Sequence, residues 1–309
     1  MKILITGGAG FIGSWVVDKF AEQGHEIVLI DDLSSGTESN INSKAEFIKC
    51  DIRDKDLLTK VFADFKPDVV DHHAAQINVR TSVDDPVYDA QINIIGSLNL
   101  LELCRVHSVK KFIFASTGGA IYGEPELLPA PEDTLPMPIS PYGTSKYAVE
   151  KYIGYYHQVY GLEYVALRYA NVYGPRQNPH GEAGVVAIFC NKILANEPCM
   201  IFGDGTQSRD YVYVSDVAEA NLLALSADCG CYNIGTGVET TVIRLTELLK
   251  GSVSGFRVDV DHTDARDGEV QSISLDNSYS RQKLGWSPDV NIEQGIERTW
   301  DWFLQNSKK

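Results

Sequence analysis

The chain has 309 residues, 44% of them hydrophobic, which is enough for one large or two modest domains with a substantial core. Its net charge of −15 argues against nucleic-acid binding, and an anionic ligand would need locally placed arginines. Six cysteines in a chain of this size do not indicate a disulfide framework, and without a supporting Cys or His cluster we expect no metal site. No apolar run approaches membrane-spanning length and the start shows no signal-peptide pattern, so we expect a cytoplasmic protein without membrane contact.

The first predicted strand, residues 2–6, leads into the glycine-rich sequence GGAGFIG at residues 7–13 and a helix over residues 11–23. Such glycines allow a tight turn and the close approach of a pyrophosphate to the helix N-terminus. A second strand, residues 25–30, is followed by Asp31, whose carboxylate can bind ribose hydroxyls and would repel a ribose phosphate. The sequence therefore predicts a dinucleotide site that favours NAD over NADP, and the alternative is a glycine-rich turn with an exposed Asp.

Strands and helices continue to alternate along the first half of the chain. We expect strands at residues 46–49, 68–71, 111–115 and 163–169, and helices at residues 57–65, 89–107 and 141–160. This alternation is typical of an α/β fold with a doubly wound parallel (Rossmann) sheet. His72 and His73 follow one strand, and we expect them to be packed and hydrogen-bonded, because no partner motif makes them ligands.

The sequence SPYGTSK, residues 140–146, places a phenol and an ammonium one turn apart on a helix. Ser140 is a good N-cap and Pro141 suits the first helical position, so Tyr142 and Lys146 share one face. A nearby cation stabilises phenolate and lowers the tyrosine pKa from about 10, so Tyr142 could exchange a proton with a substrate hydroxyl. A surface helix can carry the same spacing without chemistry, and the dinucleotide site upstream is what favours catalysis.

Two hydroxyls, Ser116 and Thr117, follow the strand at residues 111–115. Ligands of a doubly wound sheet sit at the carboxyl ends of its strands, so either hydroxyl could share a substrate proton with Tyr142. We expect one of the two to satisfy the loop backbone instead, and the sequence leaves open which one.

The pattern changes after residue 170. Residues 171–179 read as a turn-rich connection, followed by a helix at 185–195, a hairpin around 203–210 and a helix at 215–226. A strand at 231–234 and helices at 240–250 and 292–303 complete the chain. We expect a nucleotide-binding domain over residues 1–170 and a smaller mixed α/β substrate domain over residues 171–309.

Several motifs, in this order, resemble the extended short-chain dehydrogenase/reductase family, in its nucleotide-sugar branch and most closely its UDP-glucose 4-epimerases. They are GGAGFIG, the terminal Asp31, HHAAQ, Asn93, STGGAIYG, YGTSK, RYANVYGPRQ, FGDGTQSRDYVYV and YNIGTG. The resemblance covers essentially the whole chain. It implies that Tyr142 is the catalytic base, that Lys146 modifies its pKa and binds the nicotinamide ribose, and that residues 215–234 return to the sheet.

The resemblance also implies the binding residues. The NAD site would comprise Gly7, Gly10, Phe11, Ile12, Gly13, Asp31, Asp32, Leu33, Ser34, Ser35, Gly36, Asp51, Ile52, His73, Ala74, Ala75, Gln76, Asn93, Tyr142, Lys146 and Tyr169. The UDP-sugar site would comprise Thr117, Asn171, Val185, Arg209, Arg266, Glu269 and Ile273. Within it, Arg209 and Arg266 would bind the diphosphate and Glu269 the uridine ribose, while His73 and Asp32 depart from the residues common at their positions.

The activity implied by the resemblance is redox-neutral epimerisation at C4 of a UDP-hexose through a transient 4-keto sugar. Related dehydratases and decarboxylases place an acid beside the catalytic hydroxyl, where this chain has Gly118, Gly119 and Ala120. UDP-glucuronate stays open as a substrate because Arg80 or Arg176 could bind its carboxylate. The N-acetylated sugars also stay open.

Three further expectations come with the resemblance. Ile273, at the family's gatekeeper position, is intermediate in size between residues that exclude and residues that admit N-acetyl sugars. A non-catalytic NAD-binding protein is expected to have lost Tyr142 or Lys146, and both are present. The helices at 89–107 and 141–160 resemble those that pair in the family, which implies a homodimer.

Overall fold

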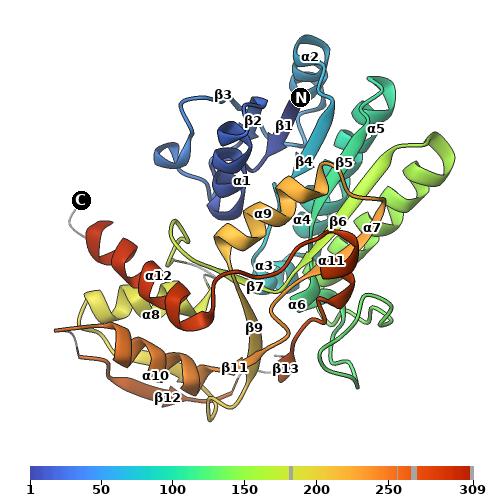
Figure 1. Cartoon of the computed structure of the whole chain (residues 1–309). Coiled ribbons are helices and arrows are strands. Elements are labelled where there is room, and N and C mark those ends of the chain that lie inside the picture. Colours follow the sequence, from blue (N-terminus) through green and yellow to red (C-terminus); the bar gives the residue numbers. More distant parts are fainter. Residues whose placement is uncertain (181–183, 256, 266–269, 307–309) are drawn as a thin grey trace.

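The computed structural model describes residues 1–180, 184–255, 257–265 and 270–306. Its centre is a parallel sheet, as predicted, and its seven strands have the order β10-β6-β5-β4-β1-β2-β3 (Figure 1). The strands are β1 (Lys2–Thr6), β2 (Glu26–Asp31), β3 (Glu46–Lys49), β4 (Val69–His72), β5 (Lys111–Thr117), β6 (Glu163–Tyr169) and β10 (Gly230–Ile234). Because all seven run in one direction, their carboxyl ends form one edge, where a ligand is expected.

Helices cover both faces of this sheet because side chains alternate along each strand. On one face, α1 (Phe11–Glu22) and α9 (Val214–Ala224) pack on a core that includes Ile3, Ile5 and Leu167. On the other face, α2 (Lys55–Phe65), α5 (Ser97–Val106) and α7 (Pro141–Tyr160) pack on Leu4, Val28 and Phe112. The doubly wound fold predicted from the alternation is therefore confirmed.

The helix predicted at residues 89–107 begins earlier than expected and is not regular. It consists of α4 (Pro86–Ala90), a π-helical segment η2 (Gln91–Gly96) and α5, and is preceded by α3 (Val79–Asp84). The start is earlier because Asp85 caps α4, accepting the backbone N–H of Tyr88, with Pro86 at the first position. The short elements η1 (Glu38–Asn40) and α6 (Gly118–Ile121) complete this half.

Two small sheets and a separate core form the rest. Strand β9 (Ser208–Tyr213) pairs with β11 (Glu239–Thr241), β13 (Ser272–Ile273) and β7 (Asn171–Tyr173), whereas β8 (Cys199–Phe202) pairs with β12 (Val260–Thr263). The helices are α8 (Val185–Leu194), α10 (Val242–Ser252), α11 (Ser278–Lys283) and α12 (Ile292–Asn306). Helices α8, α10 and α12 share a core that includes Phe189, Leu249 and Trp300, whereas α11 contacts β10 of the large sheet.

Two predictions for this half are wrong. The hairpin expected around residues 203–210 is a turn between β8 and β9, which belong to different sheets. The turn forms because Gly203 and Gly205 have positive φ, but each strand finds its partner far away in the sequence. The connection at residues 171–179 also contains β7, which pairs in parallel with β9.

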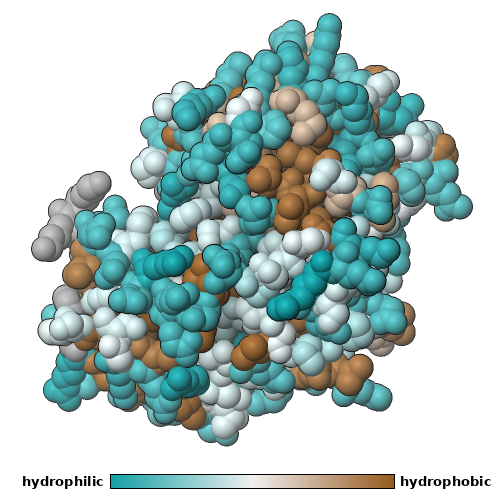
Figure 2. Space-filling model, in the orientation of Figure 1, coloured by the Kyte–Doolittle hydropathy of each residue, from teal (hydrophilic) through white to brown (hydrophobic). Residues whose placement is uncertain are grey.

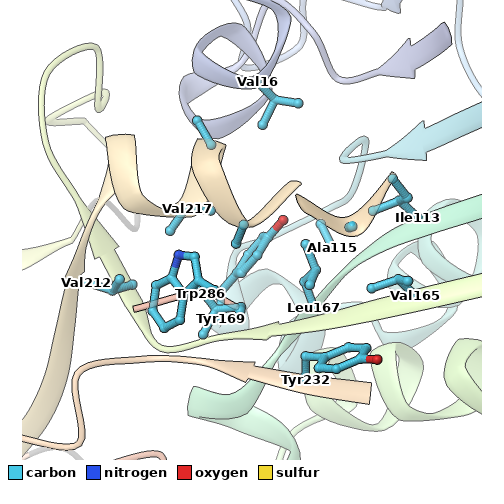
Figure 3. Close-up of a cluster of buried hydrophobic side chains, with 14 of the residues drawn as sticks. Val16, Ile113, Ala115, Val165, Leu167, Tyr169, Val212, Val217, Tyr232 and Trp286 are labelled. Carbon is cyan, nitrogen blue, oxygen red and sulfur yellow. The ribbon is translucent and has the colours of Figure 1, made fainter. Parts of the chain in front are cut away.

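The two halves share the core beside α9. Strand β10 lies next to β6 in the large sheet, and Figure 3 shows Trp286, far along the chain, packed beside Tyr169 and Val217. The division into domains of 1–170 with 215–234 and the remainder stays a prediction.

Hydrophilic side chains cover most of the face in Figure 2, with one apolar patch over the position of α9. Among the described residues, no helix is both long and apolar enough to span a membrane. The six cysteines are all free thiols. In the same described part, no cluster of His, Cys, Asp and Glu is arranged to hold a metal ion.

Candidate active site

The glycine-rich turn between β1 and α1 is shaped by close backbone contacts. Gly7 has φ of +69°, and a Cβ there would lie 2.7 Å from the backbone nitrogen of Ala74. A Cβ on Gly13 would lie 2.2 Å from the carbonyl oxygen of Gly7, so side chains are excluded at both positions. Gly10 precedes α1, whose N-terminus has no side-chain cap, and Phe11 and Ile12 form its first turn. These free N–H groups fit the pyrophosphate of NAD.

Asp31, at the end of β2, fixes the next part of the site. Its carboxylate accepts the backbone N–H of Ala9 at 3.0 Å and that of Leu33 at 2.8 Å. Burial raises the pKa of Asp31, and these hydrogen bonds oppose that rise. Asp32 accepts hydrogen bonds from Ser34, and Ser34 and Ser35 are exposed. A Cβ on Gly36 would lie 2.8 Å from the Asp31 carboxylate, so a side chain at this position would crowd that carboxylate.

The ends of β3 and β4 supply the remaining residues expected at the cofactor. Asp51 is held by a bidentate ion pair with Arg53, while Ile52 is buried. Ala74 lies against Gly7, followed by the partly buried Ala75. The Gln76 backbone N–H donates to Asn93 Oδ1 at 2.8 Å, and Asn93 Nδ2 donates back to the carbonyl of Gln76.

The two histidines differ. His72 is buried and its ring nitrogens contact Thr6 Oγ1 at 2.6 Å and Ser97 Oγ at 2.9 Å, so it is packed and hydrogen-bonded as predicted. The His73 ring stacks on Tyr169, and its Nε2 lies 3.0 Å from Asp71 Oδ1. That contact lacks hydrogen-bond geometry, so the hydrogen bonding expected of His73 is wrong. The structure packs His73 between a carboxylate and an aromatic ring.

Tyr142 and Lys146 lie in the first two turns of α7, whose N-cap Ser140 accepts the backbone N–H of Gly143 at 3.1 Å. Lys146 is buried, its ammonium donates to the carbonyl of Ala115 at 2.9 Å and lies 4.8 Å from the Phe114 ring centre. Burial lowers the pKa of Lys146 to about 8, and the charge of Asp89 opposes this. Because this pKa is only slightly above neutral pH, Lys146 still carries its proton in most molecules at pH 7.

The expectation that Lys146 lowers the pKa of Tyr142 is wrong for this structure. The tyrosine is partly exposed as a whole residue, yet burial of its hydroxyl raises its pKa above the ordinary value. The Asp89 carboxylate raises this pKa further, and a hydrogen bond with Thr117 lowers it. Burial is the largest of these effects because the protein interior replaces the water that would stabilise the phenolate oxygen.

Ser116 and Thr117 have different partners. The Ser116 hydroxyl is buried and donates to Glu150 Oε1 at 2.6 Å, and Arg168 forms a bidentate ion pair with the same carboxylate. Thr117 instead lies beside the Tyr142 hydroxyl, where it lowers the pKa of that phenol. Ser116 therefore makes structural contacts, and Thr117 is the hydroxyl that lies beside Tyr142.

Residues expected at the sugar nucleotide lie on several elements. A Cβ on Gly119 would lie 3.2 Å from Asn171 Oδ1 and 4.0 Å from Thr117 Oγ1, which brings these residues together. Val185 begins α8, and Arg209 donates to the carbonyl of Ser208 at 2.8 Å. Ile273 is only 2% exposed and belongs to the main core. Arg266 and Glu269 lie outside the described residues.

Sequence reasoning missed three buried charged residues of this region: Asp89, Glu150 and Arg168. Glu150 follows Tyr142 and Lys146 at intervals of four, a signal that places all three on one face of α7. Asp89 and Arg168 give no such signal, because their partners lie on other elements.

Comparison with known proteins agrees with this geometry. Residues 3–235 match the model of the NAD dependent epimerase/dehydratase family. A crystal structure of UDP-glucose 4-epimerase with UDP-glucose from Thermotoga maritima is 50% identical, covering 99% of this chain and 100% of that one, with a TM-score of 0.97. The enzyme of the same name from Thermus thermophilus, in complex with NAD, is 45% identical with a TM-score of 0.95 and coverage of 99% and 100%.

A third similar solved structure has a different name. A UDP-N-acetylglucosamine 4-epimerase from Methanobrevibacter ruminantium, in complex with UDP-N-acetylmuramic acid, is 38% identical, covers 98% of each chain and has a TM-score of 0.92. The family model matches three quarters of this chain, and the dinucleotide turn and the Tyr-x-x-x-Lys pair lie at one edge of the sheet. This chain therefore belongs to the NAD dependent epimerase/dehydratase family.

Proposed function

We propose that the protein is an NAD-dependent UDP-glucose 4-epimerase that interconverts UDP-glucose and UDP-galactose. The observation that carries the proposal is the contact of Thr117 with Tyr142, next to the buried Lys146, at the edge that holds the glycine-rich turn. Gly118 and Gly119 follow Thr117, so no carboxylate stands there to drive elimination. Similarity to the Thermotoga and Thermus enzymes supports the same reaction.

NAD would be held by the α1 N-terminus, Asp31 and the Gln76–Asn93 pair. When bound, it supplies a hydride acceptor that later returns the hydride, and its positive charge favours phenolate. The protein residues move the proton. Tyr142 phenolate removes the 4-hydroxyl proton as C4 is oxidised, and gives it back after the 4-keto sugar has presented its other face.

The other residues act around this transfer. Thr117 orients the proton between the sugar hydroxyl and Tyr142, and Lys146, held by the carbonyl of Ala115, would bind the nicotinamide ribose. Asn171 lies beside Thr117 and would contact the sugar, while Arg209 and Arg266 would bind the diphosphate, for which guanidinium groups are suited.

The choice between UDP-hexoses concerns the position of Ile273. Ile273, the gatekeeper position by resemblance, is buried among core side chains. The similarity to the Methanobrevibacter enzyme favours the N-acetylated pair as a second candidate. We therefore expect turnover of UDP-glucose and UDP-galactose with weaker turnover of the N-acetylated sugars.

The test is incubation of the purified protein with UDP-glucose, UDP-N-acetylglucosamine and UDP-glucuronate, followed by chromatographic separation of the epimers. Conversion of UDP-glucose to a mixture with UDP-galactose supports the proposal. Preferred turnover of UDP-N-acetylglucosamine would overturn the ranking, and no turnover of any of the three would overturn the function. A role in galactose metabolism and a cytoplasmic location stay predictions.

We also infer a C₂ homodimer. Apolar and aromatic side chains are exposed on α4–α5 and on α7, among them Val87, Ile95, Tyr152, Tyr155 and Val159. A helix surface of this kind is costly to leave in water, and a two-fold axis would pair it with its own copy. A monomeric mass by light scattering at micromolar concentration would contradict the dimer.

A further inference from the structure

The carboxylate of Asp89, on α4, is completely buried, with an exposed fraction of 0%. Carboxylates are almost never buried without partners, because desolvation of the charge is costly. Asp89 Oδ1 accepts hydrogen bonds from Gln76 Nε2 at 3.0 Å and from Asn93 Nδ2 at 2.9 Å. Its Oδ2 accepts the hydroxyl proton of Ser145 at 2.5 Å. Polar groups from three parts of the chain thus converge on this side chain.

These partners connect the two functions of the site. Ser145 lies on α7 between Tyr142 and Lys146, whereas Gln76 and Asn93 are expected at the cofactor. Gln76 and Asn93 also bond each other through their backbone and amide groups. Asp89 therefore joins the helix that carries Tyr142 and Lys146 to a segment expected in the NAD site.

The charge of Asp89 acts on both members of the catalytic pair in the same direction. It raises the pKa of Tyr142, after the larger effect of burial, and it opposes the fall in the pKa of Lys146 that burial causes. From β4, the buried His72 also faces Lys146, and burial together with that lysine lowers the pKa of His72. Arg80 and Asp84 of α3 are exposed to solvent, where water screens their charges.

We propose that Asp89 is a positioning residue that holds α7 through Ser145 and sets the pH range in which Tyr142 and Lys146 transfer a proton. The inference rests on the proposed function and deepens it. A negative charge at this place disfavours phenolate and favours ammonium. When kcat is plotted against pH, it falls on an acid limb and on an alkaline limb. Both limbs therefore lie at higher pH than they would without the charge of Asp89.

The test is Asp89→Asn, which keeps the shape of the side chain and removes its charge. We expect both limbs of the kcat profile to move to lower pH by about one unit, so that kcat one unit above the wild-type optimum falls about tenfold. Asp85→Asn is the matched control, because Asp85 lies four residues away, is exposed, and caps α4 in a way that Asn also can. It should leave both limbs in place. An equal loss of kcat at every pH, or an unchanged profile, would overturn the proposal.

Two further measurements keep the proposal open to refutation. If Asp89→Asn does not fold, Ser145→Ala removes a donor and leaves the carboxylate charge, so both limbs should move the other way, to higher pH. An unmoved profile in that variant would count against the proposal.

If the wild-type protein turns over no UDP-sugar, the proposed function fails, but coupling can still be measured by unfolding. A double-mutant cycle of Asp89→Asn with Lys146→Met should show coupling at pH 7, which fades as the pH rises above about 8 and the buried lysine loses its charge. Absence of coupling at pH 7 would overturn the proposal by itself.

Discussion

Lys146→Met should increase the free energy of unfolding at neutral pH and should abolish most of the activity. Burial lowers the pKa of Lys146 from 10.5 to about 8. At about 1.4 kcal/mol per pH unit, keeping this lysine charged inside the folded protein costs about 3 kcal/mol. The full cost applies below pH 8, where the lysine is protonated in both states. Between about pH 8 and 10.5 the unfolded chain binds more protons, so wild-type stability rises with pH.

Methionine does not titrate, so the free energy of unfolding of the variant should lack this rise. We expect the advantage of Lys146→Met over wild type to shrink by roughly 2–3 kcal/mol between pH 7 and pH 10. The variant also loses the hydrogen bond to Ala115 and the contact with Phe114. These losses change the difference in free energy of unfolding between variant and wild type by the same amount at every pH. Urea unfolding of nucleotide-free protein across this range measures it.

Lys151→Met is the matched control, because Lys151 lies on the same helix, is exposed and covers the ring of Tyr147 at 4.6 Å. Its difference from wild type should be nearly independent of pH. A difference for Lys146→Met that is constant with pH would show that Lys146 titrates like a solvated lysine, and the argument from burial would then be refuted.

Three other predictions follow from the site. Tyr142→Phe should keep its bound NAD and lose roughly 10²- to 10⁴-fold in kcat, the usual cost of losing a general base; a near-normal rate would mean that another group is the base. Thr117→Ala should lower kcat more than Ser116→Ala does, whereas Ser116→Ala should lower the free energy of unfolding by about 1–3 kcal/mol because Glu150 loses a buried donor; the reverse ranking would move the catalytic hydroxyl to Ser116. Supernatant from denatured protein should contain NAD, because the Asp31 carboxylate would repel the phosphate of NADP; recovery of NADP alone would contradict this role.

The large sheet could be predicted from the sequence because its signals are local. Apolar runs mark β1, β5 and β6, and Ser140 with Pro141 marks the start of α7 within one residue. The small sheets could not be predicted, because β9 takes its partners from strands at residues 171–173, 239–241 and 272–273. Pairing between strands of two or three residues leaves too little pattern to read.

The place of Tyr142 and Lys146 on one face of a helix could be predicted, but their ionisation could not. The spacing of Tyr142 and Lys146 places them on one face in any helix, whereas the pKa of each depends on how much water the fold excludes. Asp89 adds a charge from a helix more than fifty residues earlier in the chain. No pattern near residues 140–146 indicates that charge.

The choice between Ser116 and Thr117 shows how packing decides what adjacent residues do. Tyr142, Lys146 and Glu150 follow one another on one face of α7, and this face lies along the end of β5. Lys146 bonds the carbonyl of Ala115, Glu150 bonds the hydroxyl of Ser116, and Tyr142 contacts Thr117. Since the Glu150–Ser116 bond fixes the strand against the helix, the position of Thr117 at the phenol depends on a carboxylate two turns away. The hydroxyl that Glu150 holds is therefore part of what places Thr117 beside the phenol.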